Sequence, residues 1–363
     1  MSATNMTNVP GTEQATDDAV GARPPADLLR WSQDTVRPAL RAAVDTLPRP
    51  VRDIAAYHLG WLDEHGKATE AATGKAVRPA LALLAAEAVG GTPQAAVPSA
   101  VAVELAHNFS LLHDDVMDGD VTRRHRPTAW AVFGTAPAIL TGDALLTLAL
   151  DVLAAAGGPA ARSMRILAAA VQELVRGQAE DLAFERREEV SLDECRRMAE
   201  GKTGALMGCA AALGAVAADG SLEQVRQLRG FGEHLGLAFQ FVDDLLGIWG
   251  DPAATGKPVY SDLKSRKKTL PVVATLCGST KQGGSAEPGR ALAALYAGER
   301  PLSEADLRRA AALIDEAGAR DWSQASADDL LRRALGHLRA ARPEPRAAAE
   351  LATLAGLLTR RDH

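Results

Sequence analysis

The segment from residue 101 to residue 124, VAVELAHNFSLLHDDVMDGDVTRR, joins an apolar stretch to a dense group of charges. Its apolar residues recur every three to four positions as far as Leu112, a pattern that predicts a buried helix. Four acidic residues then occupy seven positions, and two arginines follow. Like charges at this density repel one another, and the C-terminal end of a helix already carries partial negative charge. A compensating cation is the simplest explanation for this cluster.

Three of these acids have the spacing of a metal site. Asp114, Asp115 and Asp118 stand at i, i+1 and i+4, so Asp114 and Asp118 share one face of a helix. Carboxylates at this density suit Mg²⁺, which takes one or two of them and shares its other positions with water and substrate phosphates. A solvated acidic helix end is the alternative for this cluster considered alone.

A second acidic pair has the same context. Asp243 and Asp244 follow the apolar helical stretch HLGLAFQFV, and Asp251 lies two turns further on. Two such helices facing each other would bring both clusters to the mouth of one cavity. Carboxylates on both sides of that mouth predict a site at which several Mg²⁺ ions bridge a diphosphate.

Basic residues accompany the two acidic clusters. Lys75 and Arg78 stand at i and i+3 in GKAVRP, where a helix begins, and Arg123 and Arg124 follow the first cluster. Three further lysines occur in GKTGAL, TGKP and RKKTLP, namely Lys202, Lys257 and Lys268. Each alone is typical of a solvated surface. Together with the acids, they predict two diphosphate sites, one with metal and one without.

After residue 25 the chain has a helical pattern throughout, with abundant alanine and few β-branched runs. Core helices are predicted at residues 162–185, 192–216 and 222–248, and amphipathic helices of a peripheral layer or dimer support at 304–317, 325–340 and 345–359. The glycine-rich residues 278–289 predict a flexible loop, and the polar residues 1–25 a disordered tail. We therefore expect one all-α domain over residues 26–363.

The composition argues against several functions. A net charge of -6 and 4% aromatic residues oppose nucleic-acid binding, which needs a basic face and stacking side chains. The three cysteines are far apart, which is typical of buried thiols in a reducing compartment. The N-terminus has neither the basic start nor the apolar core of a signal peptide. The most apolar region, residues 144–156, contains Asp151 and is too short for a bilayer. We expect a cytoplasmic protein without a membrane span.

The motifs, taken together and in order, resemble those of the trans-isoprenyl diphosphate synthases, or polyprenyl synthetases. They are GKAVRP, DDVMD followed by TRR, GQAEDL, GKTGAL, FQFVDD, GKP and KKTLP, and they span residues 74–273. A single DDxxD would be weak, because terpene cyclases also contain it. The resemblance implies an isoprenoid-synthase-type helical bundle around a central apolar cavity, in a homodimer with three Mg²⁺ ions per active site. It also implies head-to-tail condensation of isopentenyl diphosphate with an allylic diphosphate.

The resemblance implies a role for each matching residue. The residues implied to hold Mg²⁺ are Asp114, Asp115, Asp118, Asp243 and Asp244, with Asp251 in support. Those of the isopentenyl diphosphate pocket are Lys75, Arg78, His107 and Arg124. Those that contact the allylic diphosphate are Arg123, Lys202 and Lys257, and Lys268 joins this substrate-binding set. Those near the reacting carbons are Thr203, Gln240, Gln178 and Asp181. The implied catalytic set is Lys202, Thr203, Gln240 and Lys257.

The chain departs from the family pattern at three places. The second acidic motif usually has a third acid four residues after its first, and here that position is Gly247. His125 follows the arginine pair where glycine is common, and Tyr260-Ser261 replaces a small Gly-Asn before Asp262. We expect metal binding to survive with one carboxylate missing.

Product length is expected to depend on the helix before Asp114. Phe109 is five residues earlier, about 7.5 Å along the axis. A ring there would form a floor of the tunnel, while Ser110 and Ala106 leave room beside it. In the family, one aromatic residue at this place resembles enzymes that make geranylgeranyl diphosphate, with farnesyl diphosphate next. The alternative is that Phe109 only packs in the core.

Two other function classes remain. A terpene cyclase also ionises an allylic diphosphate through aspartates, but it needs no second diphosphate site, so Lys75, Arg78 and Arg124 oppose it. A non-catalytic subunit of a heteromeric synthase typically lacks one aspartate cluster, and this chain keeps both.

Overall fold

The computed structural model describes residues 21–69, 74, 76–251, 258–278, 286–298 and 300–359 of the 363-residue chain. Over these residues the chain is almost entirely helical, which confirms the predicted all-α fold. The strands β1 (Thr122–Arg123) and β2 (Arg126–Pro127) form a short antiparallel hairpin that the sequence did not predict.

The helices of the N-terminal half are α1 (Pro25–Val44), α2 (Arg49–His58), α3 (Val77–Ala88), the 3₁₀ turn η1 (Pro93–Ala96), α4 (Val97–Met117), α5 (Ala129–Phe133) and α6 (Thr135–Ala155). The middle of the chain forms α7 (Ala160–Arg186), α8 (Leu192–Ala199), the π-helical segment η2 (Glu200–Gly204), α9 (Ala205–Ala217) and α10 (Leu222–Trp249). The remaining helices are α12 (Ser261–Lys264), α13 (Leu270–Leu276), α14 (Glu287–Ala297), α15 (Glu304–Glu316), α16 (Ala319–Ala340) and α17 (Pro345–Thr359).

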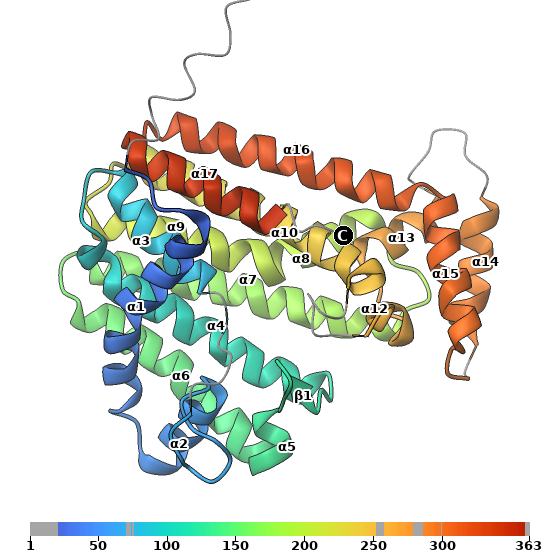
Figure 1. The fold of residues 1–363 in the computed structure, drawn as a ribbon, viewed down its shortest axis with the longest axis horizontal. Coiled ribbons are helices and arrows are strands. Elements are labelled where there is room, and N and C mark those ends of the chain that lie inside the picture. The colour runs from blue at the N-terminus through green and yellow to red at the C-terminus, as the bar shows by residue number, and fades with distance from the viewer. Residues whose placement is uncertain are drawn as a thin grey trace, which may run out of the picture.

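The long helices pack in layers (Figure 1). α10 packs against α9 and α16, α9 also packs against α3, and α4 packs against α6. α14 and α15 pair at the end of the molecule remote from α1 and α2 (Figure 1). The two helices that carry the acidic motifs, α4 and α10, both contact α9. This arrangement brings motifs that are far apart in sequence toward one region.

Small residues make the centre of the bundle compact. Every residue of α9 from Leu206 to Val216 is buried, and most are alanine or glycine. A β-carbon at Gly214 would lie 1.9 Å from the carbonyl oxygen of Ala82 in α3. The two helices therefore cross at a distance that only glycine permits, and α3 and α9 form a rigid platform behind the site.

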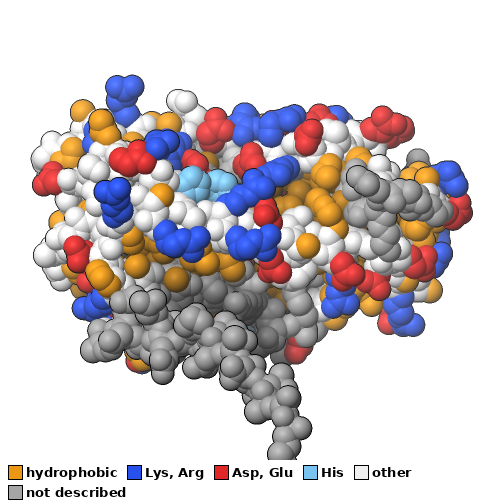
Figure 2. Space-filling model, turned by 90° about the horizontal axis from the view of Figure 1, so that it is seen from above, with side chains coloured by type: hydrophobic (Ala, Val, Ile, Leu, Met, Phe, Trp, Pro, Cys, Tyr) orange, Lys and Arg blue, Asp and Glu red, His pale blue; other side chains and the backbone are white. Residues whose placement is uncertain are grey.

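The C-terminal helices are amphipathic, as the sequence predicts. α16 buries Ala327, Leu330 and Ala334, and its outer face carries ion pairs such as Arg333 Nε to Asp329 Oδ2 at 2.7 Å. Figure 2, which views the molecule from above, shows basic and acidic side chains interspersed on this face.

Several predicted boundaries differ from the structure. Residues 192–216 were expected to form one helix, but the π-helical segment divides them into α8 and α9. The predicted loop at 278–289 overlaps α14, which begins at Glu287 because Pro288 suits the first turn of a helix. Residues 279–285 lie outside the described part of the chain.

Two helices are long and apolar enough to cross a membrane, residues 93–117 and α6. The argument that residues 144–156 are too short was wrong, because they form the second half of the 21-residue α6. The segment 93–117 is mostly buried inside the protein, and α6 packs along it. The burial of residues 93–117 is that of a core helix, which passes the same test of length and hydropathy, whereas α6 is buried over only 39% of its apolar window.

Contacts begin before the predicted end of the N-terminal tail. α1 starts at Pro25, and the guanidinium group of Arg23 pairs with Glu350 and, at 3.3 Å, with Glu87. Glu350 is 0% exposed, so this pairing compensates a fully buried carboxylate. Residues 1–20 lie outside the described part of the chain, and their predicted disorder stays a prediction.

Candidate active site

The first acidic cluster lies at the C-terminal end of α4, as predicted. Asp114 and Asp115 are in its last turn, and Asp118 caps it and is exposed. Asp115 is only 1% exposed, and its Oδ1 accepts a hydrogen bond from Nε of Arg123 at 2.6 Å. Its Oδ2 is buried and has no hydrogen-bond partner among the described residues. A buried carboxylate oxygen of this kind needs a further partner.

A hairpin returns the two arginines to this cluster. Arg124 and His125 form its turn with positive φ angles of 51° and 62°. Arg126 ties the hairpin to the α2 region, because its Nη2 donates to the carbonyl oxygen of Leu62 at 2.9 Å. The hydroxyl group of Tyr57 donates to the carbonyl oxygen of Pro127 at 2.7 Å. These bonds hold the second strand of the hairpin, and its pairing with β1 carries that constraint to Arg123.

Asp120, the fourth acid, contributes through its backbone. Its carbonyl oxygen accepts hydrogen bonds from Oγ1 of Thr128 and from Nε1 of Trp130, each at 2.8 Å. These bonds connect the end of the acidic segment to the start of α5. The residue thus anchors the loop between α4 and α5.

The second acidic pair lies within α10, which continues to Trp249 beyond it. Asp243 is exposed, whereas Asp244 is buried. Asp244 accepts hydrogen bonds from Nε2 of Gln240 at 2.7 Å and from the backbone N–H of Leu270 at 2.9 Å. Gln240 in turn accepts a hydrogen bond from Oγ1 of Thr203 at 2.7 Å. A chain of hydrogen bonds thus links the π-helical segment, α10 and α13.

Two lysines connect the acidic clusters through α7. Nζ of Lys202 lies 2.7 Å from Oδ2 of Asp181, and Nζ of Lys267 lies 3.8 Å from the same oxygen. Burial would lower the pKa of Lys267, but the carboxylates of Asp181, Asp262, Asp244 and Asp118 outweigh it and raise this pKa. Since Asp118 and Asp244 both act on one ammonium group, the two clusters converge on a common space.

Lys268, its neighbour, points elsewhere. Its Nζ donates to the carbonyl oxygens of Phe184, at 2.6 Å, and Arg187, at the C-terminal end of α7. Burial lowers its pKa, and Arg187 lowers it further. The sequence prediction named Lys268 from the motif KKTLP, whereas the structure brings Lys267 to the acidic clusters.

Burial sets the protonation of three acidic groups at the site. It raises the pKa of Asp114 to about 6, although the charge of Lys202 opposes it. It also raises the pKa of Asp115 to about 6, where Arg123 opposes it. The pKa of Asp244 rises to about 7. A bound cation would reverse these shifts, because an opposite charge favours the ionised carboxylate.

A basic pocket lies beside the first acidic cluster. Burial lowers the pKa of Arg78 to about 10, and Nε of this residue has no partner among the described residues. Burial, together with the charges of Arg78 and Arg124, lowers the pKa of His107 well below its ordinary value. Arg124 approaches Gly74 so closely that a β-carbon there would lie 2.7 Å from its Nη2. The structure thus brings together Arg78 and Arg124, whose charges suit an anion, with a neutral His107. The carboxyl group of Glu104 also lies near both arginines, and burial raises its pKa against their opposing charges.

The structure also places the residues expected near the hydrocarbon part of the substrate. Phe109 is buried in α4, and its ring meets His113 edge-on with a centroid distance of 4.8 Å. Oγ of Ser110 donates to the carbonyl oxygen of His107 at 2.8 Å. Gln178 in α7 is 4% exposed, and neither polar atom of its side-chain amide has a partner among the described residues. An amide buried in this way is suited to contact a ligand.

Two predicted residues, Lys75 and Lys257, lie outside the described part of the chain. Asp251 is exposed just after α10. Residues near the site that were missing from the sequence prediction include His58, Glu104, Asp262 and Lys267. The motif KKTLP contains both lysines, so the sequence does offer Lys267 as a candidate. Nothing in the local sequence indicates His58. Its buried Nε2 has no partner among the described residues. Burial and the charges of Arg123 and Arg124 lower its pKa to about 3.

The acidic residues fit Mg²⁺ by their chemistry. Their donors are carboxylate oxygens, and one of them, Oδ2 of Asp115, is buried without a partner in the described structure. Within the described ranges, no three His, Cys, Asp or Glu side chains already form a metal cage. Mg²⁺ needs no such cage when it shares its coordination between one or two carboxylates and a phosphate group.

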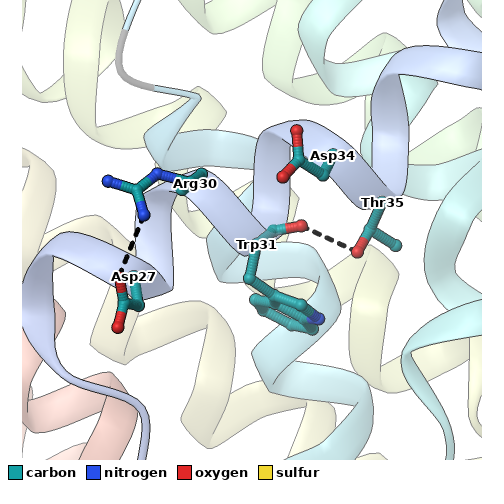
Figure 3. Close-up of a pocket in the computed structure, with 5 residues that line it drawn as sticks. All are labelled: Asp27, Arg30, Trp31, Asp34 and Thr35. Carbon is teal, nitrogen blue, oxygen red and sulfur yellow. Dashed lines mark hydrogen bonds and ion pairs between the residues drawn. The ribbon is translucent and has the colours of Figure 1, made fainter.

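Two pockets lie outside the region of the acidic clusters and the basic pocket. One, of about 500 Å³, is lined by Trp31 and polar residues of α1 (Figure 3). Two of its polar side chains pair within the helix: Arg30 with Asp27 at 3.2 Å, and Thr35 with the carbonyl oxygen of Trp31 at 2.7 Å (Figure 3). The other, of about 270 Å³, lies among α8, α10, α13 and α16. The predicted central cavity stays a prediction.

Comparison with known proteins agrees with the arrangement of these motifs. The family model described as polyprenyl synthetase matches residues 60–314. The chain is 50% identical to the (2E,6E)-farnesyl diphosphate synthase of Mycobacterium tuberculosis, in a match covering 86% of this chain and 90% of that protein. It is 44% identical to the geranylgeranyl diphosphate synthase of the same organism, with 93% and 95% covered.

A solved structure agrees as well. The polyprenyl synthetase from Streptomyces coelicolor A3(2) superposes with a TM-score of 0.87 and 47% sequence identity, covering 92% of this chain and 99% of that one. The match of the family model extends over more than half of the chain and includes both acidic motifs. This chain belongs to the polyprenyl synthetase family.

Proposed function

We propose that this protein is a Mg²⁺-dependent prenyltransferase. It condenses isopentenyl diphosphate with an allylic diphosphate, head to tail and in the trans configuration. The product is geranylgeranyl diphosphate, with farnesyl diphosphate as the next candidate. The observation that supports this most directly is the convergence of Asp118 and Asp244 on Lys267, beside a separate basic pocket. One region thus offers an acidic half for metal and diphosphate and a basic half for a second diphosphate.

Prenyl diphosphate synthases of this family generally use Mg²⁺. When bound, Mg²⁺ would neutralise the leaving diphosphate. We propose three ions per active site, held by Asp114, Asp115, Asp118, Asp243 and Asp244, with Asp251 in support. Two observations support this: Asp114 lies in the last turn of α4, and Asp244 is hydrogen-bonded to Gln240 and Leu270.

The cationic side chains would bind the same diphosphate directly. Lys202 and Lys267, both close to Asp181, are the described lysines in position to do so, and Lys257 is proposed from the motif alone. Arg123 is held by Asp115 at the edge of the cluster. Positive charge fixed before reaction stabilises the charge that develops on the leaving group.

Thr203 and Gln240 would stabilise the allylic cation through their dipoles. The hydroxyl group of Thr203 donates to Gln240, so its oxygen keeps lone pairs for a positive centre. Arg78, His107 and Arg124, with Lys75, would hold isopentenyl diphosphate with its double bond near that cation, which is catalysis by positioning. The released diphosphate takes the proton lost after C–C bond formation. An essential side-chain base found by mutagenesis would contradict that step.

The proposed homodimer rests on α6. This apolar helix is only partly covered, and Leu140 is 60% exposed. Ile139 is exposed beside it. A second copy of the chain is the proposed cover for this face, because large apolar side chains gathered on one helix favour association.

The protein is proposed to act in the cytoplasm.

The decisive experiment is incubation with isopentenyl diphosphate and each allylic diphosphate, with and without Mg²⁺, followed by mass spectrometry of the products. The expected result is a Mg²⁺-dependent C20 product that requires both substrates. Consumption of allylic diphosphate without isopentenyl diphosphate would indicate a terpene cyclase instead. No turnover by the isolated chain would favour a non-catalytic subunit.

A further inference from the structure

Two histidine side chains lie side by side where α16 packs against α10. The rings of His234 in α10 and His337 in α16 have a centroid distance of 4.9 Å and an interplanar angle of 40°. Both side chains are partly exposed, and Figure 2 shows histidine side chains (pale blue) together on the face that carries α16. His234 stands nine residues before Asp243, about two and a half turns along α10, so the pair is separate from the acidic clusters.

One nitrogen of each ring is held by α10. Nδ1 of His234 lies 2.9 Å from the carbonyl oxygen of Gly230, which can only accept, so this nitrogen carries the proton. Nδ1 of His337 lies 2.6 Å from Oε1 of Gln227. Nε2 of the same amide donates to Glu223 at 2.7 Å, which leaves Oε1 to accept the proton of His337. Both neutral rings therefore keep the lone pair of Nε2 for another partner.

The geometry of the pair suits a shared metal ion. Neither Nε2 atom has a partner among the described residues. Imidazoles that bind a metal through one nitrogen are oriented by a hydrogen bond that the other nitrogen donates, and both rings have that bond. Two imidazoles that share one ion at about 2.1 Å have ring centres roughly 5 Å apart, in agreement with the observed separation. Gly230 admits the ring of His337, because a β-carbon there would lie 2.9 Å from its Nδ1.

The surrounding charges permit a cation at this place. Burial lowers the pKa of His337, and the neighbouring His234 lowers it further. The neutral imidazole is the form that binds a metal. The carboxylate of Glu233 opposes this shift, so negative charge also lies close to the pair. Two arginines of this stretch of α10 are each paired with a glutamate at 2.7 Å, namely Arg226 with Glu223 and Arg229 with Glu233.

We propose that His234 and His337 form a binding site for a divalent transition-metal ion, which joins α16 to α10 through the two Nε2 atoms. Imidazole suits Zn²⁺, whereas Mg²⁺ prefers oxygen ligands, so this ion is distinct from the Mg²⁺ of the proposed reaction. Two protein ligands leave the other positions to water, and binding is therefore weaker than at a structural site with four protein ligands. The bound ion stabilises the packing of the two helices. This inference does not depend on the proposed activity.

The test uses the full-length, untagged protein and the variants His234→Gln, His337→Gln, Gln227→Leu and His65→Gln. His65 is an exposed histidine outside this pair and serves as the control. Binding of Zn²⁺ is measured by calorimetry in saturating Mg²⁺, so that carboxylate sites suited to Mg²⁺ are already occupied. Thermal unfolding with and without Zn²⁺ verifies the fold and measures the stabilisation by the bound ion.

Wild-type protein should bind one Zn²⁺ ion that excess Mg²⁺ does not displace, and its unfolding midpoint should rise with Zn²⁺ concentration. Gln227→Leu keeps both imidazoles but removes the bond that orients His337, and it should weaken Zn²⁺ binding about tenfold. Each histidine variant should weaken binding by more than Gln227→Leu does, and His65→Gln should match wild type.

Two results would overturn the inference. One is a wild-type protein that binds no Zn²⁺ in the presence of saturating Mg²⁺. The other is an unchanged affinity for Zn²⁺ in either folded histidine variant, because the site requires both imidazoles.

Discussion

Nζ of Lys202 lies 2.7 Å from Oδ2 of Asp181, so the π-helical segment and α7 meet through one ion pair. Burial alone would raise the pKa of Asp181, but Lys267 and Lys202 outweigh it and hold this pKa below its ordinary value. Asp181 is therefore an ionised acid that fixes two lysines at once. In the proposed reaction both lysines are therefore preorganised to bind the diphosphate.

Substitution of Lys267 should reduce turnover far more than substitution of Lys268, its neighbour. Lys267→Gln removes an ammonium group that faces both acidic clusters, and kcat/KM for the allylic diphosphate should fall about 10²- to 10³-fold. Lys268→Gln removes one that binds backbone carbonyls, and turnover should change only a few-fold. Steady-state kinetics of both variants provide the measurement. A larger loss for Lys268→Gln would contradict the assignment.

Phe109 should limit the length of the product. Phe109→Ala removes a buried ring in the turn before the acidic cluster, and products longer than those of wild type should appear. Ser110→Phe adds a ring at the neighbouring position and should shorten them. Mass spectrometry of the products measures both the expected lengthening and the expected shortening. Because a buried Phe→Ala change costs about 3–5 kcal/mol, thermal unfolding must first verify that the variant is folded. Unchanged products in both folded variants would leave Phe109 as a core residue only.

The hairpin should serve the isopentenyl diphosphate pocket more than the acidic clusters. Arg126→Ala removes the bond to the Leu62 carbonyl and the contact with the Tyr57 ring at 4.4 Å. KM for isopentenyl diphosphate should rise about five- to tenfold, in line with one or two lost hydrogen bonds. KM for the allylic substrate should change less. Equal effects on the two constants would show that the hairpin acts on the whole site.

Asp244 gives the metal-free protein a specific dependence on pH. Its pKa is about 7 in the folded protein against an ordinary value of 3.8. Between these values the folded state binds more protons than the unfolded state, so the free energy of unfolding from this group decreases as pH rises. The stability advantage of wild type over Asp244→Asn should therefore shrink between pH 4 and pH 7. Chemical denaturation with a chelator present measures it, and Asp315→Asn, at an exposed acid on α15, is the control. A difference independent of pH would contradict the shift.

The sequence predicted what depends on local pattern. The helical period before Asp114 and before Asp243 placed both motifs on long buried helices, and the family followed from their order. The helix predicted at residues 222–248 likewise contains Asp243 and Asp244, and α10 ends one residue beyond it.

What it missed depends on contacts between distant segments. The choice between Lys267 and Lys268 depends on the directions of two side chains in the segment just before α13. His58 meets the basic pocket only because the hairpin folds back on α2. The pairing of His234 with His337 is likewise a property of two helices in contact. Spacing in one sequence carries none of this information.

The π-helical segment at residues 200–204 carries Lys202 and Thr203, and it holds one residue more than the α-helical turn it replaces. Loss of that residue would rotate everything beyond it by about 100°. α8 could not then keep Met198 in its apolar cluster while α9 keeps Gly214 against Ala82. At this point the protein should accept no single-residue insertion or deletion, so the length of the chain is itself under constraint.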